Sequence, residues 1–215
     1  MSELRNWAIS RIDVHLPIVL EKEKKNWENE QRKSGDWQDV DYDYCREMCI
    51  NALDFHLTEV NNCIDNMTPQ ILDDWRSGKR DLWPSPDGFG YRLNGDHPLA
   101  ESGDMQLSEA WEIVRPWFVE PETDNFSMNS IHPDYWFQGE YDLVYRWDGN
   151  IKIVDIKASK GSNDRSGDYV KQLRIYAMLW WATHGKQEFV DKLEIWYLGA
   201  NIVKDVQVPT EKELR

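Results

Sequence analysis

Cysteine is scarce in this sequence, and long hydrophobic runs are missing from it. There are three cysteines among 215 residues, an odd number that argues against a disulfide framework and indicates a reducing compartment. The longest apolar run spans 177–182 and is far too short to cross a bilayer. The first ten residues have neither the apolar stretch nor the cleavage pattern of a signal peptide. We therefore expect a soluble, cytoplasmic protein without a membrane partner.

Positive charge is also in short supply. The formal net charge is −14, which counts against a broad electrostatic contact with nucleic acid. The charge is unevenly placed, however, because the acidic residues lie mostly before residue 125. Between Lys152 and Arg174 there are six basic and three acidic residues. We expect a local basic strip on an otherwise acidic body.

The first part of the chain, residues 1–125, has a helical composition. It also contains a loop rich in glycine and proline over 78–104, and loops of that length are usually functional or mobile. Apolar periodicity and proline positions predict helices over 17–33 with Pro17 in the first turn, over 40–65, from Thr68 onward, and around 107–118 with Pro116 at the end.

The second part, residues 126–215, mixes strand and helix patterns. Two alternating apolar runs joined at Asp148-Gly149 predict a β-hairpin over 136–157. The remaining elements are a helix over 167–185 and two strands over 192–199 and 202–208. This order gives a β-β-α-β-β core, and we expect the two parts to form one structural domain.

Charged residues interrupt the hairpin strands at Asp142, Asp155 and Lys157. If Asp148-Gly149 is a two-residue turn, Asp142 lies directly opposite Asp155, with Cβ atoms about 4.5–5.5 Å apart. A Gly149-Asn150 turn would instead place Asp142 opposite Lys157, and only a three-residue turn would separate the three side chains. The three residues therefore share one face in two of the three registers.

Two facing carboxylates repel each other, but they become favourable when a divalent cation lies between them. Oxygen ligands with room for water suit Mg²⁺ or Mn²⁺. Lys157 lies two residues after Asp155 on the same face, where it could assist an attacking water or offset charge on a developing phosphorane. The alternative is an ordinary charged strand that faces solvent.

A second polar pair, Gln172 and Tyr176, is four residues apart and so shares one face of the predicted helix over 167–185. The pair follows the hairpin after a basic loop that is rich in serine and glycine. This is where a helix that positions a substrate would lie. The alternative is a helix surface that happens to carry one polar group.

Three ordered motifs resemble the RecB-like branch of the PD-(D/E)XK nuclease superfamily, which includes the RecB and AddB nuclease domains and the CRISPR-associated RecB-like exonucleases. The motifs are Gly139-Glu140-Tyr141-Asp142, Asp155-Ile156-Lys157 and Gln172-Leu173-Arg174-Ile175-Tyr176, within a match over about 135–208. The resemblance implies an α/β restriction-endonuclease-like core, in which a mixed β-sheet is flanked by helices, with a helical N-terminal portion before it.

The resemblance also implies roles for individual residues. Asp142, Asp155 and the main-chain carbonyl of Ile156 would bind the metal ion, and Lys157 would serve the attacking water. Gln172 and Tyr176 would brace the site and touch the DNA backbone. The substrate-binding residues expected on the basic strip and its helix are Lys160, Arg165, Lys171, Gln172 and Tyr176.

The sequence departs from the RecB-like pattern in two ways. The further metal ligand on an upstream helix has one well-placed candidate, His56, for which the alternative is a structural histidine. Several relatives carry a four-cysteine iron–sulfur cluster, but this chain has only Cys45, Cys49 and Cys63. Cys45 and Cys49 fit one apolar helical face, so we expect core cysteines and no cluster.

The function that follows is Mg²⁺- or Mn²⁺-dependent hydrolysis of DNA, as an exonuclease on single strands or duplex ends. We expect a setting in DNA repair, recombination or CRISPR-type processing, with a helicase or a larger nuclease complex as partner. Trp83 and Trp136 are candidate contacts for DNA bases. The alternatives are a non-catalytic nuclease-fold module that binds DNA or a helicase, and a protein-interaction scaffold.

Overall fold

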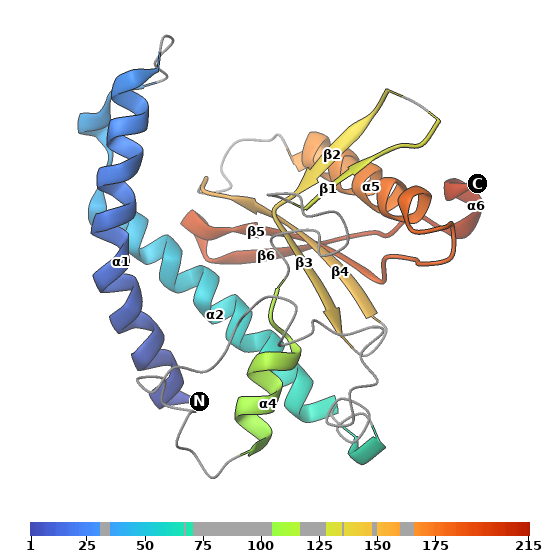
Figure 1. The fold of residues 1–215 in the computed structure, drawn as a ribbon, viewed down its shortest axis with the longest axis horizontal. Coiled ribbons are helices and arrows are strands. Elements are labelled where there is room, and N and C mark those ends of the chain that lie inside the picture. Colours follow the sequence, from blue (N-terminus) through green and yellow to red (C-terminus); the bar gives the residue numbers. More distant parts are fainter. Residues whose placement is uncertain are drawn as a thin grey trace.

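The structure is a computed structural model that describes residues 1–30, 35–66, 68–70, 105–116, 128–134, 136–147, 150–159 and 166–215. Its N-terminal half is helical, and α1 and α2 pack side by side (Figure 1). In the described residues of this half the elements are α1 (Ser2–Asn29), the short 3₁₀ helix η1 (Trp37–Asp39), α2 (Tyr42–Asn66) and α4 (Met105–Ile113). The loop expected over 78–104 lies outside the described residues. None of the described helices is both long and apolar enough to span a bilayer.

Helix α1 begins fifteen residues before the predicted start, so the prediction that Pro17 opens a helix is wrong. Two bidentate ion pairs join α1 to α2, with Arg5 Nε 2.6 Å from Asp54 and Arg46 Nε 2.6 Å from Asp13. These contacts lie before Pro17 along α1. They stabilise turns that apolar periodicity alone does not reveal.

Helix α2 confirms the helix predicted over 40–65. Asp41 caps its first turn, because its carboxylate accepts hydrogen bonds from the backbone amides of Asp43 and Tyr44 at 2.9 and 3.2 Å. Three buried residues follow at three-residue spacing, namely Leu57, Val60 and Cys63. The last of them packs in the core as expected for a buried cysteine.

The C-terminal half is built on a four-stranded mixed sheet with the order β3-β4-β5-β6 (Figure 1). The strands are β3 (Leu143–Trp147), β4 (Asn150–Lys157), β5 (Lys192–Tyr197) and β6 (Ile202–Val206). Only the central pair, β4 and β5, is parallel, and α5 (Ser166–Thr183) makes the crossover between them. The predicted α/β core with flanking helices and a helical N-terminal portion is confirmed.

Both faces of the sheet are covered. Val144, Ile153 and Ile195 pack against Leu173 and Trp180 of α5. On the opposite face, Leu143, Tyr145, Val154 and Trp196 pack together with Phe55 of α2. Side chains of β4 alternate between the two faces, so odd-numbered positions point toward α5 and even-numbered positions toward α2.

Polar contacts also join α2 to the sheet. Lys152 is only 6% exposed, and its Nζ lies 2.5 Å from Glu59 of α2 and 3.1 Å from Glu194 of β5. Lys152 is therefore internal, although the sequence placed it in the basic strip. At the end of β4, the Tyr44 hydroxyl donates to the Ala158 carbonyl at 2.9 Å, close to the 3₁₀ turn η2 (Leu198–Ala200).

Two further elements were not predicted. A short strand, β1 (Met128–Ile131), pairs with β2 (Gln138–Tyr141) as a separate two-stranded sheet that lies against α5. The predicted first strand of the hairpin is thus broken at Asp142 into β2 and β3. A single turn, α6 (Glu211–Leu214), packs Leu214 against Trp181 of α5.

Replacing Lys152 with methionine tests the buried ion pairs. Lys152→Met leaves the carboxylates of Glu59 and Glu194 without their shared cation, and we expect a loss of about 3–5 kcal/mol in the free energy of unfolding. Urea denaturation followed by circular dichroism measures the change. The matched control is Lys22→Met on the exposed side of α1, expected within about 0.5 kcal/mol of the wild type. Equal stability of the two variants would contradict a supporting role for Lys152.

Candidate active site

The pairing of β3 with β4 decides where the two acids lie. Leu143 is opposite Val154 and Trp147 is opposite Asn150, so two residues separate the strands and the Asp148-Gly149 register is confirmed. Continuing this register by one residue brings Asp142 level with Asp155. The other two registers considered from the sequence are excluded.

Asp142 occupies the joint between β2 and β3, and its side chain is exposed. Its Oδ2 accepts a hydrogen bond from the backbone N–H of Ile156 at 2.6 Å. The Asp142 carboxylate therefore accepts a hydrogen bond from β4 at the point where the backbone hydrogen bonds between β3 and β4 end. This contact fixes Asp142 against the residue that follows Asp155.

Asp155 is buried at 2% exposure on the α5 side of β4. Lys157, the next residue on that face, places Nζ 2.6 Å from Asp155 Oδ2. Burial raises the pKa of the Asp155 carboxyl above its usual range; Lys157 opposes this shift, and nearby Asp142 adds to it. The ionised form of Asp155 is thus disfavoured by its surroundings, and an additional cation between the two acids would relieve this.

Helix α5 brings the predicted amide and phenol to the same place. Gln172 Nε2 donates to the Tyr176 hydroxyl oxygen at 2.6 Å. Burial raises the pKa of Tyr176; the Gln172 contact lowers it, and the charges of Asp155 and Asp142 raise it again, so the phenol is within electrostatic reach of both acids. Five of the predicted site residues therefore meet here: Asp142, Asp155, Lys157, Gln172 and Tyr176.

Gly139 explains how β2 approaches α5 so closely. A Cβ at this position would lie 2.7 Å from Leu179 Cδ1 and 2.8 Å from Tyr176 Cε1. A larger residue would push the ring of Tyr176 away from its position beside the acids. Tyr176 can therefore take its position because residue 139 is a glycine and has no Cβ.

Two tyrosines at the site were not found from the sequence. The ring centroid of Tyr169 is 4.7 Å from Lys157 Nζ, which is a cation–π contact. Tyr197 pairs with Lys157 in the parallel register of β4 and β5, and burial raises its pKa, with Tyr169 and Asp155 adding to the rise. Tyr169 lies one helical turn before Gln172, so helical spacing could have revealed it. Tyr197 follows from the rule that parallel strands end at one edge.

His56 lies on the other side of the sheet. Its Nδ1 is 3.1 Å from the Tyr145 hydroxyl, and its ring stacks on Tyr145 and meets Trp111 edge-on. Burial lowers the pKa of His56 to about 4, and the neighbouring ammonium of Lys152 acts in the same direction. Tyr145 points toward α2, whereas Asp155 points toward α5. The placement does not support His56 as a ligand of an ion held by Asp142 and Asp155.

Three of the four basic residues of the strip that the structure describes make ion pairs within the chain. Lys152 is buried, Lys157 pairs with Asp155, and Arg174 lies 2.6 Å from Glu213. Lys171 is exposed on α5 beside Gln172. The other two expected substrate-binding residues, Lys160 and Arg165, fall outside the described residues.

The donor set suits a hard divalent cation. Two carboxylates approach each other next to the backbone of Ile156, and one of them is buried with a raised pKa. Within the described parts of the chain, no group of three or more His, Cys, Asp or Glu side chains gathers as a metal cluster. Oxygen donors that leave several positions for water are typical of Mg²⁺ sites. The two acids therefore fit Mg²⁺ or Mn²⁺.

Comparison with protein families agrees with this geometry. The model of the PD-(D/E)XK nuclease superfamily matches residues 69–214, more than half of the chain, and this range contains all five residues that meet at the site. Comparisons with curated proteins and with solved structures gave no significant match. On the strength of the family match, the chain belongs to the PD-(D/E)XK nuclease superfamily.

Proposed function

We propose that this protein is a metal-dependent deoxyribonuclease that hydrolyses phosphodiester bonds. The observation that carries the proposal is the buried ion pair of Asp155 and Lys157 beside Asp142, on a face that also presents Gln172 and Tyr176. A purely structural ion pair has no need of a second carboxylate, which only raises the cost of ionising the first. A site that recruits a divalent cation needs both carboxylates.

Asp142, Asp155 and the main-chain carbonyl of Ile156 would hold Mg²⁺ or Mn²⁺. The Ile156 N–H points to Asp142, and the N–H and C=O of one residue leave a strand on the same side, so the carbonyl is directed toward Asp142 as well. When bound, the ion would supply Lewis-acid stabilisation of the charge that develops on the phosphoryl oxygens.

Lys157 has the position of a group that acts on the attacking water. Its ammonium is held between the Asp155 carboxylate and the face of the Tyr169 ring, which fixes the direction of its N–H donors. One donor is used by Asp155, and the others are available to orient a water and to offset negative charge in the transition state. Tyr169 and Asp155 thereby position Lys157.

Helix α5 would hold the substrate. The Gln172–Tyr176 hydrogen bond pre-organises an amide and a phenol that can contact the sugar–phosphate backbone. Lys171 is the adjacent exposed cation, and we propose Lys160 and Arg165 as further phosphate contacts. The bound metal ion would add positive charge to a protein whose net charge is −14.

The order of the three motifs supports assignment to the RecB-like branch. On that assignment the protein is an exonuclease that acts on single strands or duplex ends, in DNA repair, recombination or CRISPR-type processing. A helicase or a larger nuclease complex would be its partner.

A second candidate is a non-catalytic module that binds DNA or a helicase partner. It is favoured by the position of His56, which leaves two carboxylates without a third side-chain ligand among the described residues. Calorimetry separates the two functions, because the module predicts DNA binding without measurable affinity for Mn²⁺.

Cleavage of DNA should require a divalent metal ion. Incubation with end-labelled DNA should give products with Mg²⁺ or Mn²⁺ and none with EDTA. Lys157→Ala should lower the rate about 100- to 1,000-fold, because the transition state loses a charged donor. Lys22→Ala, on exposed α1, is the control and should cleave like the wild type. Undiminished cleavage by Lys157→Ala would refute the role of this lysine.

The role of Asp155 can be tested by thermal stability, without an assay of cleavage. Because surrounding groups raise the pKa of this carboxyl, its ionised form destabilises the fold above that pKa, so Asp155→Asn should raise the melting temperature at pH 7 in EDTA. Mg²⁺ or Mn²⁺ should stabilise the wild type and leave Asp155→Asn unchanged. Thermal unfolding monitored by circular dichroism measures both effects, and Asp65→Asn on α2 is the neutral control.

The metal response should also depend on pH. A protonated carboxyl is a poor metal ligand, so stabilisation by the ion should disappear as the pH falls through the raised pKa of Asp155. The loss should occur at a higher pH than for an ordinary aspartate, whose pKa is about 3.9. Metal stabilisation that persists in Asp155→Asn would show that the ion binds elsewhere.

A further inference from the structure

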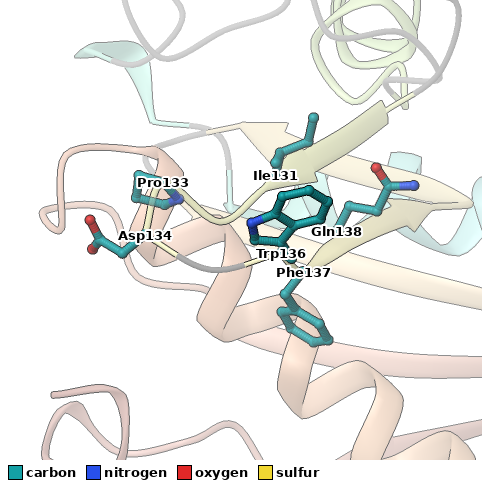
Figure 2. A pocket seen from close by; sticks show the side chains of 6 residues that line it. All are labelled: Ile131, Pro133, Asp134, Trp136, Phe137 and Gln138. Carbon is teal, nitrogen blue, oxygen red and sulfur yellow. The ribbon is translucent and has the colours of Figure 1, made fainter.

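The hairpin of β1 and β2 carries an unusual surface at its tip. Trp136 is fully exposed, at 108% of its reference area, and Ile131, which pairs with Gln138, is 62% exposed. A hollow of about 580 Å³ lies here. It is lined by Ile131, Pro133, Asp134, Trp136, Phe137 and Gln138. Figure 2 shows the side chains of the residues that line it.

Hydrogen bonds and the packing of Phe137 hold the tip of the hairpin in place. The His132 N–H donates to the Phe137 carbonyl at 2.8 Å, and the Asp134 N–H donates to His132 Nδ1 at 3.1 Å. Phe137 packs against the core cluster of the sheet and α5, and Figure 2 shows it pointing away from the indole of Trp136 toward the helix. Anchoring of Phe137 therefore presents the neighbouring Trp136 to solvent on a supported backbone.

We propose that this hollow binds an unpaired nucleobase of a single-stranded nucleic acid, which stacks on Trp136. Base–aromatic stacking is the usual way in which proteins hold single strands without reading sequence. The amide of Gln138 and the carboxylate of Asp134 line the same hollow, and both groups can hydrogen-bond to base edges. None of the six lining residues carries a positive charge, so the surface suits a base better than a phosphate.

Strand β2 connects the hollow to the candidate active site, and the proposal rests on the proposed nuclease function. Strand β2 leads from Gln138 to Tyr141, and Asp142 follows directly. The six steps from Trp136 to Asp142 cover about 20 Å at the usual rise of a strand. A strand that is cleaved at Asp142 and Asp155 would therefore reach the hollow a few nucleotides from the scissile bond.

A protein partner fits this surface less well. A stable protein–protein interface buries at least about 1,000 Å² around an apolar centre. The large exposed apolar side chains that the described part of the hairpin offers are Ile131 and Trp136. That is enough for one planar ring and too little for a second copy of the chain.

Binding measurements in EDTA test the proposal, because the strand then stays intact. Fluorescence anisotropy with a labelled single-stranded oligonucleotide should show Trp136→Ala binding about 5- to 100-fold more weakly than the wild type, with Trp136→Phe close to the wild type. The same strand made abasic along its length should bind the wild type and Trp136→Ala equally. Phe189→Ala, which removes another exposed aromatic side chain, is the control and should not change affinity.

Three outcomes would overturn the proposal. Unchanged affinity of Trp136→Ala for the intact strand means that the hairpin does not contact it. An equal loss for intact and abasic strands means that the substitution acts through structure and not through stacking. A wild type that sediments as a dimer while Trp136→Ala sediments as a monomer means that a second copy covers the hollow.

Failure of the nuclease function would give a different pattern. If Trp136→Ala weakens binding of the intact strand in EDTA but the wild type cleaves nothing with Mg²⁺ or Mn²⁺, the stacking proposal stands and the nuclease proposal fails. If cleavage of DNA depends on Lys157 but Trp136→Ala binds the intact strand like the wild type, the nuclease proposal stands and the stacking proposal fails.

Discussion

An aspartate and a lysine that are buried together beside a second carboxylate set the conditions for the whole site. Asp155 and Lys157 nearly neutralise each other, yet the exposed carboxylate of Asp142 adds a second negative charge beside the buried pair. The surrounding elements hold this arrangement in place: α5 covers the pair, and Gly139 lets β2 come close enough to place Tyr176 over it. Repulsion between facing carboxylates destabilises an ordinary sheet, and the proposed divalent cation would offset it here.

Strand β4 carries two lysines that point to opposite faces of the sheet. Lys152 points to the α2 face and is enclosed by Glu59 and Glu194, so its charge is used to join a helix to the sheet. Lys157 points to the α5 face, where its ammonium pairs with Asp155 and lies against the ring of Tyr169. The alternation of side chains along a strand puts the two charges on different faces, and so keeps the ion pairs that join α2 to the sheet apart from the Asp155–Lys157 pair.

Local rules predicted how the central residues of the candidate site are arranged. The Asp148-Gly149 turn fixed the register of β3 and β4, and helical spacing brought Gln172 and Tyr176 onto one face. Properties that depend on tertiary contacts were missed. The break at Asp142 depends on β2 leaving the sheet to pack on α5, and the face taken by His56 depends on how α2 is rotated against the sheet. The division at residue 125 stays a prediction.

The ion pairs of Lys152 also bear on how the chain can be cut. The family match begins at residue 69, so a trimmed version of the protein would naturally omit α1 and α2. Such a fragment would leave Tyr145, Val154 and Trp196 facing water and Lys152 without Glu59. An exposed apolar sheet face of this kind promotes aggregation. The helical half thus covers one apolar face of the sheet, and the nuclease region produced without this half would aggregate.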